Sequence, residues 1–173
     1  EVGRKHNVQY LARRKRPPMS LSLEYKLLNR TVLSMVRKQL GLENAHIFPT
    51  AGARASPEVE EFVHAIGLNI MVGYGLTESV ATVSCDHLDK PITLGSVGRV
   101  IEGLQLKIGE NNEVLLKGPT ITKGYYKRES LNATIFTEDG FFRTGDAGYI
   151  KDGELFLTER IKDLYKTSNG KYI

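Results

Sequence analysis

The sequence contains a single cysteine, Cys85, among 173 residues. One cysteine cannot form a disulfide within the chain, which favours a reducing compartment. No apolar run approaches the ~18 residues that a membrane-spanning helix requires, and the N-terminus lacks the basic-then-apolar pattern of a signal peptide. These absences predict a cytoplasmic protein, with peripheral association with a membrane and the oligomeric state left open.

The composition is that of an ordinary globular protein, with 40% hydrophobic and 25% charged residues. The length suits one ordinary domain or two small ones. The chain begins at Glu1 rather than at a methionine, and it stops at "NGKYI" without a closing signal. We therefore interpret it as part of a longer polypeptide.

Positive charge is concentrated at the N-terminus. The formal net charge is +4, from 24 basic and 20 acidic residues. Residues 1–16 hold six basic residues and one acid, so they carry +5 and leave −1 for the rest of the chain. The run "RRKR" at 13–16 fits either a nucleic-acid patch or, as we expect, a solvated helix end or loop. No interleaved aromatics or known motif accompany it, so nucleic acid is not expected as a partner.

Residues 1–91 have the pattern of an α/β layer. Apolar residues over 21–40 recur mostly at three- and four-residue spacing, which predicts an amphipathic helix. The stretch "HIFPTAG" predicts a short buried strand. Ser56 and Pro57 then begin a second helix, which ends at Gly67. "NIMVGYG" is the next strand, and strand, helix and strand in this order predict parallel pairing.

The pattern changes from about residue 92. Short alternating segments, "LQLKI", "EVLLKG" and "ELFLTE", are separated by the turn signals "GENNE", "GPT", "EDG" and "KDG". They predict a small antiparallel sheet with one helical insert, capped by Ser130. The predicted fold class is α/β: a partial α/β layer over 1–91, a small antiparallel β-barrel-like subdomain over 92–158, and a hinge or linker over 159–173.

The stretch "GYGLTES" places chemical groups directly after a strand. Gly73 and Gly75 allow the main chain to approach a flat ligand, and Tyr74 offers an aromatic face for stacking. Thr77 can donate to a phosphate oxygen, and Glu78 can hold the magnesium ion that shields the same phosphate. The structural alternative is a helix that Thr77 caps and whose dipole Glu78 favours. Taken alone, this alternative is favoured, because short motifs match by chance.

Three other stretches each have a ligand-binding and a purely structural interpretation. In "PTAGARAS" a strand ends at a glycine loop, where α/β layers collect ligands, or where a tight connection begins. In "FFRTGDAGYI" the carboxylate of Asp146 can accept both hydroxyls of a ribose, or occupy a β-turn. In "TERIKDLYKTSNGKYI" Arg160 can bind ribose or phosphate, or lie on the surface.

The order and spacing of these stretches are more specific than any one of them. "GYGLTES", "GSVGRV", "GPTITKGYYK", "FFRTGDAGYI" and "ERIKDLYKTSNGKYI" follow one another over about 45–173. In this order they resemble the acyl-adenylate-forming superfamily of acyl-CoA synthetases, luciferases and peptide-synthetase adenylation domains. The last of them is most similar to the long-chain fatty-acid–CoA ligases.

The resemblance implies a role for each matching position. Contacts with ATP or AMP are implied for Gly52, Ala53, Arg54, Tyr74, Gly75, Thr77, Asp146 and Arg160. Thr77 and Glu78 are implied to be catalytic, with Glu78 as the metal ligand. Asp163 is the implied hinge to a C-terminal domain, and Lys166 and Gly170 lie on the implied CoA path.

The resemblance also implies the reaction. A carboxylate, expected to be that of a long-chain fatty acid, attacks the α-phosphorus of ATP to give acyl-AMP and pyrophosphate, and the CoA thiol then displaces AMP. ATP, Mg²⁺ and CoA are the implied cofactor and substrates. The alternatives are a ligase for an aryl or medium-chain acid and an AMP-binding scaffold without turnover. The 173-residue chain by itself is expected to be inactive, since the family's phosphate loop and C-terminal lysine are not among its motifs.

Overall fold

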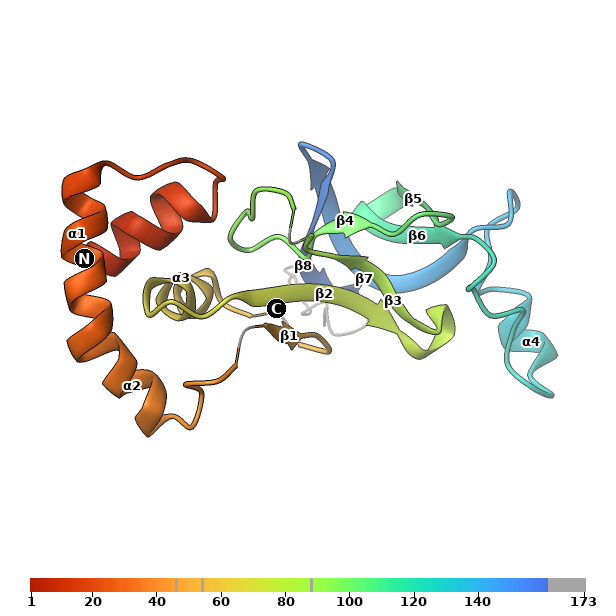
Figure 1. The fold of residues 1–173 in the computed structure, drawn as a ribbon. Helices are drawn as coiled ribbons and strands as arrows, with labels where there is room; N and C mark the ends of the chain where they lie inside the picture. The colour runs from red at the N-terminus through yellow and green to blue at the C-terminus, as the bar shows by residue number, and fades with distance from the viewer. Residues whose placement is uncertain (46, 54, 88, 162–173) are drawn as a thin grey trace, which may run out of the picture. The chain divides into compact units, whose positions relative to one another are not determined.

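The computed structural model describes residues 1–45, 47–53, 55–87 and 89–161 (Figure 1). The chain forms two compact units. The first consists of Glu1–Gly73 and Asp86–Gly98, and the second consists of Tyr74–Cys85 and the chain from Arg99 onward. The limits predicted for the domains of a longer protein, at 91 and 158, stay predictions.

The first unit begins with helices. The π-helical η1 (Arg4–Leu11) is followed by α1 (Met19–Leu28), the π-helical turn η2 (Asn29–Leu33) and α2 (Ser34–Gln39). The last three are continuous, so the helix predicted over 21–40 is confirmed, and Figure 1 draws it in red to orange. No helix in the described part of the chain has the length and apolar character needed to cross a bilayer.

Strand, helix and strand follow as predicted: β1 (Phe48–Thr50), α3 (Pro57–Ala65) and β2 (Ile70–Leu76). The helix starts at Pro57, and the Ser56 hydroxyl accepts a hydrogen bond from the backbone N–H of Val59 at 3.3 Å. Gly67, at a φ of +84°, lets the chain leave the helix, because glycine adopts this conformation without a Cβ clash. β1 pairs in parallel with β2, which confirms the predicted pairing.

An apolar core holds the first unit together. Leu33, Ile66 and Leu68 are its buried members, and Tyr25, Leu28, Val36, Leu42, Phe48 and Val63 pack against them. Glu60 of α3 is also buried, and its Oε2 accepts a hydrogen bond from the backbone N–H of Gly95 at 2.8 Å. Because a buried carboxylate requires hydrogen-bond partners, this bond attaches the 86–98 segment to α3.

The second unit is mainly antiparallel. Its strands are β3 (Ala81–Cys85), β4 (Arg99–Val100), β5 (Gln105–Ile108), β6 (Glu113–Lys117), β7 (Phe142–Lys151) and β8 (Glu154–Arg160). β3 pairs with β4, and β5 to β8 form a four-stranded sheet in sequence order. At the "KDG" signal, Asp152 and Gly153 both have positive φ and connect β7 to β8 in a two-residue hairpin turn.

The four-stranded sheet curves because its register shifts twice, between Glu113 and Leu115 of β6 and between Asp146 and Gly148 of β7. The curve of β7 is visible in Figure 1. Buried residues of this unit include Val83, Val114, Leu115, Leu116, Phe142, Ala147 and Leu155.

Three short helical segments complete the second unit: η3 (Thr77–Ser79), η4 (Glu110–Asn112) and α4 (Glu129–Asn132). The insert predicted within the sheet is α4, but the prediction that Ser130 caps it was wrong. The helix begins one residue earlier, at Glu129, and has no side-chain cap.

Candidate functional site

Two side chains of the second unit that lie far apart in the sequence meet at a hydrogen bond. Tyr74 belongs to β2 and Asp146 to β7, 72 residues later. The Tyr74 hydroxyl donates to Oδ2 of Asp146 at 2.6 Å, and the tyrosine is only 9% exposed. Burial first, and then the Asp146 carboxylate, raise the pKa of Tyr74 far above its usual 10.0. The hydroxyl therefore stays protonated at neutral pH and acts as a fixed donor to the carboxylate.

The second carboxylate oxygen of Asp146 faces a cation. Asp146 stands opposite Arg160 in the pairing of β7 with β8, and Nε of Arg160 lies 3.5 Å from Oδ1. The backbone N–H of Asp146 donates to Oγ1 of Thr144 at 3.1 Å, which fixes the main chain beneath the carboxylate. The Arg160 side chain is 65% exposed, so its guanidinium has donors left for a ligand. Asp146 lies inside a strand, and the alternative that it occupies a β-turn was wrong.

A second cluster surrounds Glu78. The segment 77–79 forms one helical turn after β2, with Glu78 in the middle. Oε1 of Glu78 accepts a hydrogen bond from the Tyr125 hydroxyl at 2.5 Å, and its backbone carbonyl accepts one from the N–H of Thr122 at 2.7 Å. The bond to Glu78 raises the pKa of Tyr125 to about 12. Thr77 is exposed and does not cap the turn, which Leu76 precedes, so the capping alternative was wrong.

The backbone after Glu78 is tightly constrained. A Cβ at Gly75 would lie 1.4 Å from the carbonyl oxygen of Ala81, so only glycine fits where the end of β2 meets the start of β3. Val80 and Ala81 follow with φ of 54° and 79°. Positive φ is unusual for any side chain and an outlier for a β-branched one. The close approach explains Gly75 by packing within the protein; its predicted ligand contact stays a prediction.

The residues around Glu78 are compatible with one magnesium ion held together with a phosphate. No group of three or more His, Cys, Asp or Glu residues in the described ranges could hold a metal by itself. Magnesium in nucleotide sites is commonly bound through one or two carboxylates plus phosphate and water oxygens. Tyr125 occupies one oxygen of Glu78, and no described residue bonds the other. Glu78 can therefore supply one ligand oxygen.

The remaining predicted residues fall into two groups. Gly52 and Ala53 lie in the first unit, in the exposed loop after β1, where a Cβ at Gly52 would meet nothing within 4 Å. Arg54, Asp163, Lys166 and Gly170 lie outside the described residues. Their predicted roles, like those of the two clusters, stay predictions.

Tyr125 and Thr144 belong to the two candidate clusters, and the sequence did not single them out. Both lie in stretches that carry the family resemblance, "GPTITKGYYK" and "FFRTGDAGYI". The signal available in the sequence was a tyrosine directly after a glycine, Gly124. In the structure this glycine has a φ of +133°, which only glycine adopts readily. No local pattern shows that this tyrosine reaches Glu78, 47 residues away.

A match to a known family includes the Glu78 cluster and ends before Asp146. A family model described as AMP-binding enzyme matches residues 10–126, more than half of the chain. The chain belongs to the AMP-binding enzyme family.

Two curated relatives are long-chain fatty-acid–CoA ligases by name. FadD15 of Mycobacterium bovis is 32% identical over 158 residues, which cover 91% of this chain and 26% of FadD15. Long-chain-fatty-acid–CoA ligase 4 of Saccharomyces cerevisiae is 34% identical over 158 residues, covering 85% of this chain and 23% of that ligase. The chain spans about a quarter of the length of these relatives.

Solved structures share the fold. ATP-bound MatB from Rhodopseudomonas palustris superposes with a TM-score of 0.66 at 26% identity, over 73% of this chain and 27% of MatB. Wild-type E. coli MenE with a bound phenylether-linked analogue of OSB-AMS gives 0.60 at 27% identity, over 80% of this chain and 30% of MenE. The predicted α/β fold class, with its antiparallel second part, is confirmed.

Proposed function

We propose that this chain is part of an ATP-dependent acid–CoA ligase that activates a long-chain fatty acid. The acid attacks the α-phosphorus of ATP, pyrophosphate leaves, and the CoA thiol then displaces AMP from the acyl-AMP. The observation that carries the proposal is the Asp146 carboxylate, held by Tyr74 on one oxygen and by Arg160 on the other. The curated relatives named above support the fatty acid as substrate.

Asp146 is the proposed ribose ligand. Each carboxylate oxygen has about two acceptor positions, so Oδ2 can accept from a ribose hydroxyl as well as from Tyr74. The fixed tyrosine donor limits the carboxylate to one orientation before ATP arrives, which reduces the entropy lost on binding. Arg160 neutralises the carboxylate and offers its remaining N–H groups to ribose or phosphate.

Glu78 is the proposed magnesium ligand, and Thr77 a donor to the phosphate. Bound magnesium would stabilise the negative charge that develops on the phosphoryl oxygens. Tyr125 orients Glu78 by donating to Oε1, which leaves Oε2 directed by a fixed side chain. Thr77 is exposed beside it. Its backbone carbonyl accepts a hydrogen bond from the N–H of Val80 at 3.2 Å, but no bond of its hydroxyl is found within the described ranges, so the hydroxyl is available.

An aryl acid is the second candidate substrate. It is favoured by the similarity to MenE with a bound OSB-AMS analogue. Release of pyrophosphate by the full-length protein, measured across a panel of fatty and aryl acids, distinguishes the two. A rate with aryl acids above that with every fatty acid would overturn the proposed substrate and leave the adenylation chemistry intact.

The test of the site is Glu78→Gln in the full-length protein. Loss of a metal ligand removes charge stabilisation worth several kcal/mol, so the rate should fall by about a hundredfold or more. Glu110→Gln is the matched control, since Glu110 is an exposed carboxylate of the same unit outside the proposed site. Near-normal pyrophosphate release by the Glu78 variant would remove the metal assignment.

A further inference from the structure

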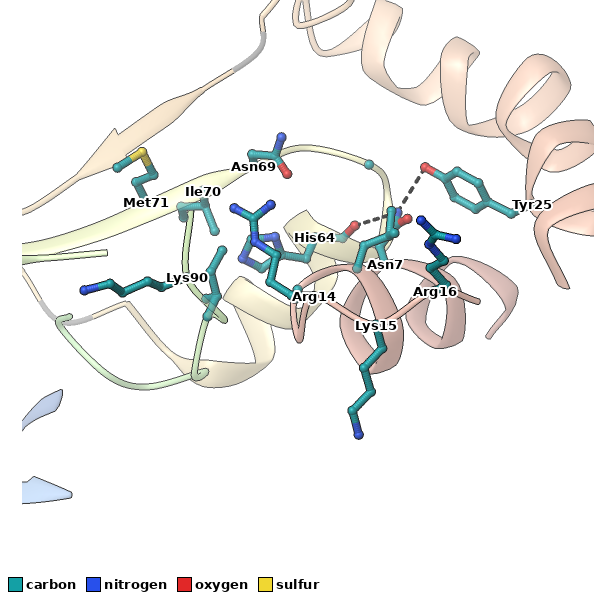
Figure 2. A pocket seen from close by; sticks show the side chains of 14 residues that line it. Asn7, Arg14, Lys15, Arg16, Tyr25, His64, Asn69, Ile70, Met71 and Lys90 are labelled. Atoms are coloured by element: carbon teal, nitrogen blue, oxygen red, sulfur yellow. Dashed lines mark hydrogen bonds between the residues drawn. The ribbon is translucent and has the colours of Figure 1, made fainter. Parts of the chain in front are cut away.

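A cavity of about 550 Å³ lies within the first unit, lined by residues after η1, at the end of α3 and at the start of β2 (Figure 2). Small-ligand sites typically have volumes of about 300–1,000 Å³. The loop of Gly52 follows the carboxyl end of β1, whereas the cavity adjoins the amino end of its parallel partner β2. The two therefore lie at opposite edges of this strand pair, and the inference does not rest on the proposed adenylation site.

The charged side chains around the cavity are all basic. Arg14, Lys15, Arg16 and Lys90 line it, and no aspartate or glutamate does. Figure 2 shows Arg14 directed toward the start of β2 and Lys15 directed away from the other labelled side chains. Neither Arg14 nor Arg16 forms an ion pair with a described residue. Their uncompensated charge makes the cavity attractive to an anion.

A buried histidine contributes an unused polar atom to the same cavity. His64 is 4% exposed, and its Nε2 has no hydrogen-bond partner among the described residues. Its backbone carbonyl accepts a bond from Nδ2 of Asn7 at 2.9 Å, so the residue is held in place. Burial lowers the pKa of His64. A buried polar atom without a partner calls for an explanation, since most such atoms are bonded.

Arg14 occupies a position that normally belongs to glycine. Its φ is 56°, and after η1 its N–H bonds to the carbonyl of Leu11 at 2.9 Å, while that of Lys15 bonds to Tyr10 at 2.8 Å. Helices commonly end in this left-handed conformation, with glycine at the left-handed residue because it carries no Cβ penalty. Arg14 therefore places its guanidinium at the cavity although its backbone conformation is strained. Backbone strain of this kind is concentrated at functional sites.

We propose that this cavity binds a phosphate monoester that carries an apolar group. Arg14 and Arg16 suit the phosphate, because guanidinium groups match its oxygens in paired hydrogen bonds. Leu11, Ile70 and Ile92 provide apolar wall for the rest of the ligand. Nε2 of His64 is available to bond an oxygen of the ester. The basic run at 13–16 thereby acquires a small-molecule role rather than a nucleic-acid one.

Nuclear magnetic resonance of the 173-residue chain tests the proposal with phenyl phosphate as the probe. Inorganic phosphate and phenol, titrated separately, represent its two halves. Phenyl phosphate should bind at least about tenfold more tightly than either, and should shift the amide signals of Gly67 and Asn69 and the Nε2 signal of His64. Absence of these shifts, or phenol binding as tightly as phenyl phosphate, would overturn the proposal.

Arg14→Gly separates binding from folding. Glycine relieves the left-handed backbone, so the variant should be at least as stable to heat as the parent, yet bind phenyl phosphate at least about tenfold more weakly. Arg16→Gln should also weaken binding. Arg13→Ala is the matched control, because Arg13 belongs to the same basic run and does not line the cavity. Equal loss in the Arg13 and Arg14 variants, or binding of a single-stranded oligonucleotide that depends equally on both, would show a surface charge effect and contradict the proposal.

Discussion

Replacing Tyr74 by phenylalanine removes one hydroxyl from the candidate site and nothing else. In the native chain this hydroxyl donates to Asp146 at 2.6 Å from a tyrosine that is 9% exposed. A hydrogen bond to a charged group contributes about 1.5–3 kcal/mol. Asp146 keeps Arg160 as a partner and retains some access to water, so the lower half of this range applies. We expect Tyr74→Phe to lower the free energy of unfolding by about 2 kcal/mol at pH 8.

The destabilisation caused by Tyr74→Phe should decrease as the pH rises. The folded pKa of Tyr74 is raised above the unfolded value of 10.0. Its contribution is therefore fully present below pH 10 and declines above it, because the unfolded tyrosine ionises while the folded one does not. At pH 10.5 the ionisation stabilises the unfolded parent chain by about 0.8 kcal/mol relative to pH 8. The difference between parent and variant should fall by the same amount.

Urea unfolding at pH 8 and pH 10.5, followed by circular dichroism, measures both quantities. Other tyrosines titrate in both proteins and cancel in the difference. Tyr149→Phe is the control, since Tyr149 stacks on Phe156 and no hydrogen bond of its hydroxyl is found within the described chain. This control should change stability at pH 8 by no more than about 0.5 kcal/mol. A difference for Tyr74→Phe that is as large at pH 10.5 as at pH 8 would refute the assigned protonation.

Three further changes test the turn around Glu78. Gly75→Ala should prevent the chain from folding normally, measured by loss of dispersed amide signals, because its Cβ would lie 1.4 Å from the Ala81 oxygen; a stable variant would contradict the packing. Val80→Gly should raise the free energy of unfolding by about 1 kcal/mol, since a β-branched residue at φ 54° is strained. A lower free energy of unfolding would mean instead that Val80 makes stabilising contacts. Glu78→Gln should move the titration of Tyr125, followed at 295 nm, from about 12 toward its usual 10.0; an unchanged midpoint would show that the Glu78 charge does not act on it.

The sequence by itself determined the elements whose bonds are local. Local patterns, with residues three or four apart, predict three features without a structure. These are the continuous helix from Met19 to Gln39, the cap at Ser56 and the helix end at Gly67. The parallel pairing of β1 with β2 followed from the helix between them. The order of the glycine-bearing motifs indicated the family, which the match over residues 10–126 confirms.

Only the tertiary structure decided which of these groups meet. Tyr74 reaches Asp146 across 72 residues, and Tyr125 reaches Glu78 across 47. The first contact joins strands of two different sheets, and the second joins a turn to the helical segment at 77–79, so no local pattern in the sequence predicts either of them. The register shift between Asp146 and Gly148, in the pairing of β7 with β8, is likewise not predicted by any residue pattern in the sequence. The basic run at 13–16 was predicted to be a solvated helix end or loop, and its four side chains are exposed. Only the tertiary structure shows that Arg14 and the buried His64 line one cavity.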